Sequence, residues 1–190
     1  MSMIKDDISL IDLQNINYQL DSALLIRYQD QTIHCNELLR IVPKKRLVFK
    51  GTHLNKNVII KLFIHPSRAK KHWQRECQGT DLLKNKQILS PEAIARGMSD
   101  EGVYFIIFAY IEGQSLAEYW KAQAQIGREE IIKQMLPLLY QHHQQGLAHQ
   151  DLHYGNFFLA DKNRDIYTLD GEEVKESHTP LNISDRLANL

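Results

Sequence analysis

Asp151, Asn156 and Asp170 fall within one short stretch, LAHQDLHYGNFFLADKNRDIYTLDGEE, which covers residues 147–173. Asp151 and Asn156 are five residues apart, and Asp170 follows the apolar run that ends at Leu169. Mg²⁺ takes oxygen ligands, usually one or two side chains supplemented by phosphate oxygens and water. Asn156 and Asp170 offer an amide oxygen and a carboxylate for such an ion. The Asp151 carboxylate is then left to accept a proton from an attacking hydroxyl group.

Each of these residues alone has a simpler explanation than catalysis. Loop Asp and Asn side chains often cap helices or close turns, and a lysine on a strand usually faces solvent. The set is harder to explain in this way, because Asp151, Asn156 and Asp170 share one loop region beside apolar segments. Lys61 lies inside the apolar segment VIIKLF, and a helix that carries Glu76 follows it. We therefore expect these residues to be functional.

The first half of the chain is predicted to be mainly β, because β-forming residues are interrupted by short polar turns. The predicted elements are two strands within 23–35 around a turn at 29–31, a helical turn at 36–42 that stops at Pro43, a hairpin at 46–65 turned at 55–57, a helix at 67–85 and a hairpin at 89–113 turned at 99–102. Its return strand, residues 103–111, is uniformly apolar, as expected for a strand buried on both faces.

The second half is predicted to be mostly helical, with one small hairpin. The predicted elements are a helix at 115–125, an amphipathic helix at 128–146 that Gly146 ends, and short strands at 156–160 and 165–170 around a turn at 161–164. Pro137 lies inside the long helix, so we expect a kink or two helices there. Strands with one helix, followed by helices with a hairpin, predict an α+β protein with two lobes joined near residues 109–113.

The catalytic stretch resembles a known superfamily. HQDLHYGN followed by YTLDGEE resembles the catalytic and metal-binding loops of the protein-kinase-like superfamily, in which an Asp and an Asn are also five residues apart. DLHYGN, with His153 and Gly155, is more like the branch of aminoglycoside, choline and lipopolysaccharide sugar kinases. PKKRLVFKGTHLNKNVIIKLF and SDRLANL are similar to the first hairpin and the late helix of the lipopolysaccharide kinases, which include the Kdo and core heptose kinases. The resemblance covers residues 46–190.

The resemblance implies a two-lobed protein-kinase-like fold. Residues 1–108 would form the N-lobe, an antiparallel sheet with one main helix that binds nucleotide and carries an N-terminal extension. Residues 109–113 would be the hinge, and residues 114–190 a mostly helical C-lobe with the catalytic and metal loops. Only residues 171–190 follow Asp170, so this C-lobe would be short, either because the branch is minimal or because the C-terminus is truncated.

The resemblance also assigns roles in nucleotide binding. Lys61 would bind the phosphates of ATP and pair with Glu76 in the following helix. Gly51 would be the lone glycine of the phosphate loop, so that phosphate is held more by Lys61 and the metal than by loop backbone. The carbonyl of Ala109 and the N–H of Ile111 would meet adenine.

The remaining roles belong to the catalytic stretch. Asn156 and Asp170 would bind Mg²⁺, and Asp151 would act as the catalytic base. His149 is expected to be structural, tying the loop to the backbone of the metal site. His153 would either shape the loop or reach a phosphate.

These roles imply an ATP-dependent phosphotransferase, with ATP and Mg²⁺ as cofactors and a hydroxyl acceptor, for which the resemblance suggests a lipopolysaccharide inner-core sugar, Kdo or heptose. A small-molecule or protein kinase of the same fold is the enzyme alternative. A pseudokinase that serves as an interaction module is the other alternative. The complete set of site residues argues against a pseudokinase, whereas the single glycine and the short C-terminus argue for one.

Composition and charge limit the classes of partner and the location that the sequence allows. The 23 basic and 23 acidic residues give a net charge of zero, which argues against a general nucleic-acid binder. Residues 1–15 contain no long apolar run and predict neither a signal peptide nor a membrane anchor. We therefore expect a cytoplasmic protein. A basic helix face with Arg68, Lys70, Lys71 and Arg75 is either a solvated surface or a contact for an anionic acceptor or the inner membrane.

Overall fold

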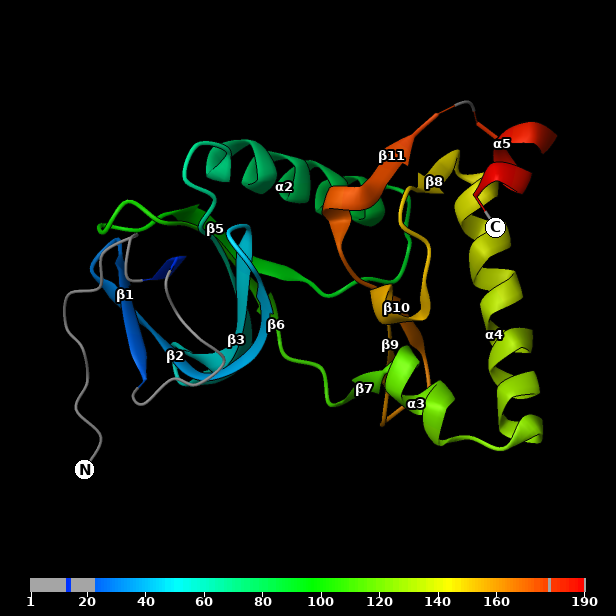
Figure 1. The fold of residues 1–190 in the computed structure, drawn as a ribbon, viewed down its shortest axis with the longest axis horizontal. Helices are drawn as coiled ribbons and strands as arrows, with labels where there is room; N and C mark the ends of the chain where they lie inside the picture. Colours follow the sequence, from blue (N-terminus) through cyan, green and yellow to red (C-terminus); the bar gives the residue numbers. More distant parts are fainter. Residues whose placement is uncertain (1–12, 15–22, 178, 190) are drawn as a thin grey trace. The chain divides into compact units, whose positions relative to one another are not determined.

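The computed structural model describes residues 13–14, 23–177 and 179–189, and its elements carry the labels of Figure 1. The prediction made for the N-terminal stretch 1–15 lies outside the described residues, apart from residues 13–14. Contacts divide the chain into two compact units. The first comprises Met1–Gln74 and Glu92–Tyr110, and the second comprises Arg75–Pro91 and Ile111–Leu190. The assignment of residues 1–108 and 114–190 to a nucleotide lobe and a catalytic lobe stays a prediction.

The first unit is built on a curled six-stranded antiparallel sheet in the order β1-β2-β3-β4-β6-β5 (Figure 1). Its strands are β1 (Leu24–Tyr28), β2 (Gln31–Val42), β3 (Arg46–His53), β4 (Lys56–Phe63), β5 (Ala93–Met98) and β6 (Tyr104–Ala109). The apolar residues of β3 and β4 alternate inward and form the core with Leu24, Ile33 and Ile107. Four successive residues of β6, Phe105–Phe108, are buried, which confirms the prediction of a strand covered on both faces.

Residues 36–42 were expected to form a helical turn, and this prediction is wrong. They continue β2, which pairs antiparallel with β3 across register shifts between Cys35 and Glu37 and between Leu38 and Arg40. The short apolar pattern of this segment fits a helix and a strand equally well. Pairing with β3 favours the strand, because it provides hydrogen-bond partners for the backbone N–H and C=O groups and lets Leu38 and Ile41 pack against the core. Pro43 directly follows the strand, where its missing N–H costs no ladder bond.

The hairpin of β3 and β4 is confirmed, with its turn slightly earlier than predicted. Leu54 and Asn55 form the turn and both have positive φ, 48° and 60°. Helix α2 (Ala69–Asn85) follows β4. Its first part is anchored in the first unit by Trp73, whose indole N–H donates to the carbonyl of Phe105 over 3.0 Å. From Arg75 onward the helix belongs to the second unit.

The second unit combines helices with short strands. Its elements are α3 (Leu116–Ala122), α4 (Gln125–Gln144), α5 (Ile183–Ala188), a three-stranded sheet in the order β10-β9-β7, a strand pair of β11 with β8, and two single-turn helices, η1 (Tyr154–Asn156) and η2 (Gly171–Glu173). The strands are β7 (Gly113–Ser115), β8 (Leu147–His149), β9 (Phe157–Ala160), β10 (Ile166–Thr168) and β11 (Val174–Glu176). The hairpin predicted around residues 161–164 is confirmed as β9 and β10.

Helix α4 runs unbroken through Pro137, so the alternative of two separate helices is wrong. Buried residues lie on both sides of the proline, with Ile131 and Met135 before it and His142 and His143 after it. Packing on both sides therefore outweighs the hydrogen bond that Pro137 removes.

The α+β class and the curled antiparallel sheet agree with the fold predicted from sequence, in the form of a shortened kinase-like fold. Among the described residues, no helix combines the length and the apolar character needed to cross a membrane.

Candidate functional site

The loop that carries Asp151 begins at a paired strand. In the second unit β8 pairs with β11, with His149 opposite Val174. The N–H of Gln150 donates to the carbonyl of Glu173 over 2.8 Å, which extends this pairing to the residue before Asp151. The Asp151 side chain is 65% exposed. The strand pair therefore fixes the backbone of the loop while its carboxylate faces solvent.

Asn156 links this loop to the segment that carries Asp170. Its side chain is buried, and its Nδ2 donates to the carbonyl of Asp151 over 2.7 Å. Its own carbonyl accepts from the N–H of Leu169 over 2.8 Å. Because the amide nitrogen is engaged with Asp151, the amide oxygen is the atom through which Asn156 would bind a cation. The structure thus joins Asp151, Asn156 and the residue before Asp170 through hydrogen bonds.

Asp170 stands at the junction between β10 and η2. Its backbone is left-handed, with φ 58° and ψ 71°. A residue other than glycine pays roughly 1–2 kcal/mol for this conformation, and such strain is often found at functional sites. The turn aims the chain into η2, and the carbonyl of Asp170 accepts from the N–H of Glu173 over 3.3 Å.

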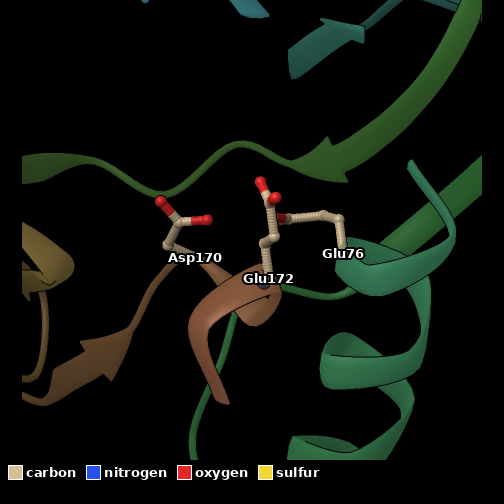
Figure 2. A group of neighbouring side chains, drawn as sticks. All are labelled: Glu76, Asp170 and Glu172. Atoms are coloured by element: carbon tan, nitrogen blue, oxygen red, sulfur yellow. The ribbon is translucent and has the colours of Figure 1, made fainter. Parts of the chain in front are cut away.

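Three carboxylates meet beside this turn (Figure 2). Ligand oxygens of Glu76, Asp170 and Glu172 all lie within 4.8 Å of one another. Glu76 projects from α2, whereas Asp170 and Glu172 come from the segment around η2. The N–H of Glu172 donates to Oε2 of Glu76 over 3.2 Å. Glu76 and Glu172 are buried, whereas Asp170 is half-buried.

Arg75 contributes a positive charge to this group. Its Nη1 lies 3.6 Å from Oε1 of Glu172, and its Nη2 donates to the Glu172 carbonyl over 3.3 Å. Nη2 also lies 4.0 Å from Oε2 of Glu173. The sequence put Arg75 on a basic helix face that is either solvated or in contact with an anionic partner; in the structure its side chain is 35% exposed and contacts η2 of the same chain.

The donors of this cluster fit a hard divalent cation. Carboxylate oxygens, with the amide oxygen of Asn156, are the ligand types that Mg²⁺ prefers. Asp170 is the member predicted from sequence to bind the ion. Glu172 was missed, since nothing in the spacing of DGEE singles out its side chain.

Two glycines set the distance between α2 and η2. A Cβ added to Gly79 would lie 1.8 Å from the carbonyl oxygen of Gly171, and one added to Gly171 would lie 2.6 Å from the backbone nitrogen of Thr80. The two backbones therefore touch, which brings Glu76, one turn before Gly79, beside Glu172. A glycine inside a predicted helix is a sequence signal for such close packing.

The remaining predicted site residues belong mainly to the first unit. Lys61 lies on β4, and its Nζ stands 5.2 Å from the centre of the Phe108 ring. Ala109 ends β6, and its N–H donates to the carbonyl of Glu92 over 2.8 Å. Ile111 follows as the first residue of the second unit, outside helices and strands. Binding of adenine by Ala109 and Ile111, and pairing of Lys61 with Glu76, stay predictions.

Gly51 has a steric reason to be glycine. It lies within β3, before the hairpin turn, and faces Cys35 of β2 and Val58 of β4. A Cβ at this position would lie 1.9 Å from the carbonyl oxygen of His34. Close strand packing accounts for the glycine by itself, and its contact with phosphate stays a prediction.

Buried histidines lie next to the loop that carries Asp151. His149 is 2% exposed, and the side chain of Asn189 brackets its backbone, because Asn189 Nδ2 donates to the His149 carbonyl over 2.6 Å and Asn189 Oδ1 accepts from the His149 N–H over 3.2 Å. Burial lowers the pKa of His149, while the Leu169 backbone and then the Asp170 and Asp151 carboxylates act in the opposite direction. This neighbourhood agrees with the structural role expected for the residue.

His142 is the most strongly perturbed of these groups. It is 2% exposed, and its Nε2 lies 3.2 Å from Oγ1 of Thr168. Burial lowers its pKa from 6.5 to about 4, with smaller contributions from His149 and His143. The folded protein therefore holds this ring neutral near pH 7.

Gly79→Ala is expected to lower the free energy of unfolding by about 1–3 kcal/mol, because the added methyl group collides with backbone. Urea unfolding measures the change. Gly127→Ala is the control, since that helical glycine faces only the flexible side chain of Gln123, and alanine there should be neutral or stabilising by up to about 1 kcal/mol. Equal stability of the two variants would contradict the close approach of α2 to η2.

The free energy of unfolding is expected to fall as pH drops from about 6.5 to 4. Over this range the unfolded chain binds a proton at His142 that the folded chain does not accept until its pKa of about 4. By pH 4.5 the difference amounts to about 2–3 kcal/mol. Urea unfolding of the wild type and of His142→Gln at pH 7 and 4.5 separates this contribution from other titrations. Parallel losses in the two proteins would show that His142 is not the cause.

A protein-family model of the ABC1 atypical kinase-like domain matches residues 77–178, more than half of the chain. The matched segment contains Asp151, Asn156, Asp170 and Glu172. This confirms the protein-kinase-like superfamily predicted from the loop motifs, and it does not extend to the lipopolysaccharide kinases. The chain thus belongs to the family of ABC1 atypical kinase-like domains.

Proposed function

We propose that this chain is an ATP-dependent phosphotransferase that moves the γ-phosphate of ATP to a hydroxyl group. The observation that carries the proposal is the hydrogen-bonded link from Asp151 through Asn156 to Leu169, which holds the base, the amide and the residue before Asp170 in one unit. The match to an atypical kinase-like domain over the same residues supports it.

In this proposal Asp151 is the catalytic base. The acceptor hydroxyl gives its proton to the Asp151 carboxylate while its oxygen bonds to the γ-phosphorus, and the bond from that phosphorus to the β–γ bridging oxygen breaks to release ADP. The exposed position of the carboxylate, 65% accessible, leaves room for an acceptor. Asn156 keeps the Asp151 backbone in place.

Asp170 and Asn156 would hold Mg²⁺ in this proposal, with Glu172 and Glu76 as further carboxylates beside Asp170. When bound, the ion neutralises charge on the phosphates. Lys61 would hold the α- and β-phosphates, with the adenine against Ala109 and Ile111. The protein contributes alignment and charge neutralisation more than covalent chemistry.

For the acceptor we propose a lipopolysaccharide inner-core sugar, Kdo or heptose, on the strength of the motif DLHYGN and of the basic hairpin sequence. The exposed basic residues Arg68, Lys70 and Lys71 would meet an anionic acceptor or the inner membrane. A transfer screen over core sugars, small alcohols and proteins tests the acceptor. A pseudokinase is the other outcome, shown by ATP binding in a thermal-shift assay without transfer to any of them.

Asp170→Asn is expected to abolish phosphate transfer and the Mg²⁺-dependent part of the thermal shift caused by ATP, because the amide lacks the charge that binds the ion. Asp161→Asn, an exposed aspartate in the turn between β9 and β10, is the matched control and should behave like the wild type. Full activity of Asp170→Asn would refute the metal-binding role.

Asp151→Asn is expected to leave ATP binding unchanged while transfer falls by roughly 10²–10⁴-fold, the usual effect of losing a general base. Single-turnover transfer measures the chemical step, and the thermal shift with ATP and Mg²⁺ reports binding. Unchanged transfer would reject Asp151 as the base.

A further inference from the structure

His153 lies between two partners in the loop after β8. Its Nδ1 accepts a hydrogen bond from the N–H of Gly155 over 2.9 Å, which caps η1. Its Nε2 lies 3.3 Å from Oδ2 of Asp151. One ring therefore joins the cap of the single-turn helix to the proposed catalytic base.

The first contact decides where the ring carries its proton. A backbone N–H can only donate, so Nδ1 must present its lone pair to Gly155, and the proton of a neutral imidazole then resides on Nε2. This N–H faces the Asp151 carboxylate. The neutral ring is thus a fixed donor to Oδ2.

Gly155 makes this placement of the ring possible. A Cβ on Gly155 would lie 2.8 Å from Cε1 and 2.9 Å from Nδ1 of His153. Any larger residue would push the ring away from the cap and from Asp151. The glycine of DLHYGN is therefore explained by its contact with the imidazole.

We propose that His153 is a positioning residue that orients the Asp151 carboxylate for proton transfer. An exposed carboxylate on a loop has free side-chain rotation, and a donor held by the backbone restricts it. Asn156 holds the carbonyl of Asp151 and His153 holds Oδ2, so Oδ1 is left to receive the proton of the acceptor hydroxyl. The inference rests on the proposed function, because orientation of Asp151 matters only where it acts as the base.

Two substitutions separate this role from a purely structural one. An asparagine oxygen can replace Nδ1 and keep the cap to Gly155, but it offers no donor at the position of Nε2. A glutamine nitrogen can replace Nε2 and keep the donor to Asp151, but it loses the cap. The positioning role predicts that His153→Asn is the more damaging change, and a capping role predicts the reverse.

Steady-state transfer with varied ATP measures the effect. For His153→Asn we expect kcat to fall by about tenfold, the effect of one lost hydrogen bond, with the KM for ATP within twofold of the wild type. His153→Gln should keep a kcat within about threefold of the wild type. Gly155→Ala should lose about as much kcat as His153→Asn. A larger loss for His153→Gln, or wild-type kcat in His153→Asn, would overturn the positioning role.

Nitrogen chemical shifts of the imidazole, recorded by NMR on ¹⁵N-labelled protein, provide a readout that does not depend on activity. We expect the Nε2–H tautomer, with an Nε2 shift that moves in Asp151→Asn. A proton on Nδ1, or no response to Asp151→Asn, would overturn the positioning role alone. No transfer by the wild type to any acceptor would refute the proposed function, and the positioning role with it, even if the tautomer is as expected.

Discussion

The approach of two backbones, at Gly79 in α2 and Gly171 in η2, is the constraint on which the candidate metal site depends. The space between them admits no side chain, because a Cβ on either glycine would fall well inside contact distance of the other backbone. This closeness lets Arg75 and Glu76, neighbours on α2, engage both backbone groups of Glu172, one at its carbonyl and one at its N–H. The position of Asp170 is set by the same segment, so the helix and the loop act as one support.

The carboxylates of Glu76, Asp170 and Glu172 bring negative charges close together, and neighbouring groups offset part of this charge. Carboxylates within 4.8 Å of one another repel when ionised, and burial strengthens that repulsion because fewer water molecules screen it. Arg75 offsets part of it from the η2 side, and the N–H of Glu172 offsets part of it at Glu76. A divalent cation at Asp170 would add further compensation. The closeness of the three carboxylates is therefore expected to favour binding of a hard cation.

The sequence was most informative where function depends on local spacing. Asp151, Asn156 and Asp170 could be singled out as candidates because the first two are five positions apart in one loop and the third follows the short hairpin of β9 and β10, and the hairpin turns at Asn55 and Gly102 follow local chemistry. Residues 36–42 could not be assigned correctly, because their short apolar pattern fits a helix or a strand and pairing with β3 determines that they form a strand. The contacts of Glu172 with Arg75 and Glu76 were missed because these residues are distant in sequence. Only Gly79 and Gly171 could have indicated that the two segments pack closely.

The family match is unevenly distributed over the chain. It begins at residue 77, directly after Glu76, and covers the rest of α2, the strands β5 and β6, and the segment that carries Asp151, Asn156 and Asp170. Lys61 and Gly51 lie before the matched segment, so their roles in phosphate binding stay predictions from the residue pattern. In the proposed function the chemistry would take place in the second unit, where hydrogen bonds join Asp151, Asn156 and the residue before Asp170. The sheet of the first unit would then be needed mainly to hold the nucleotide, and its residues would affect KM for ATP more than the transfer step.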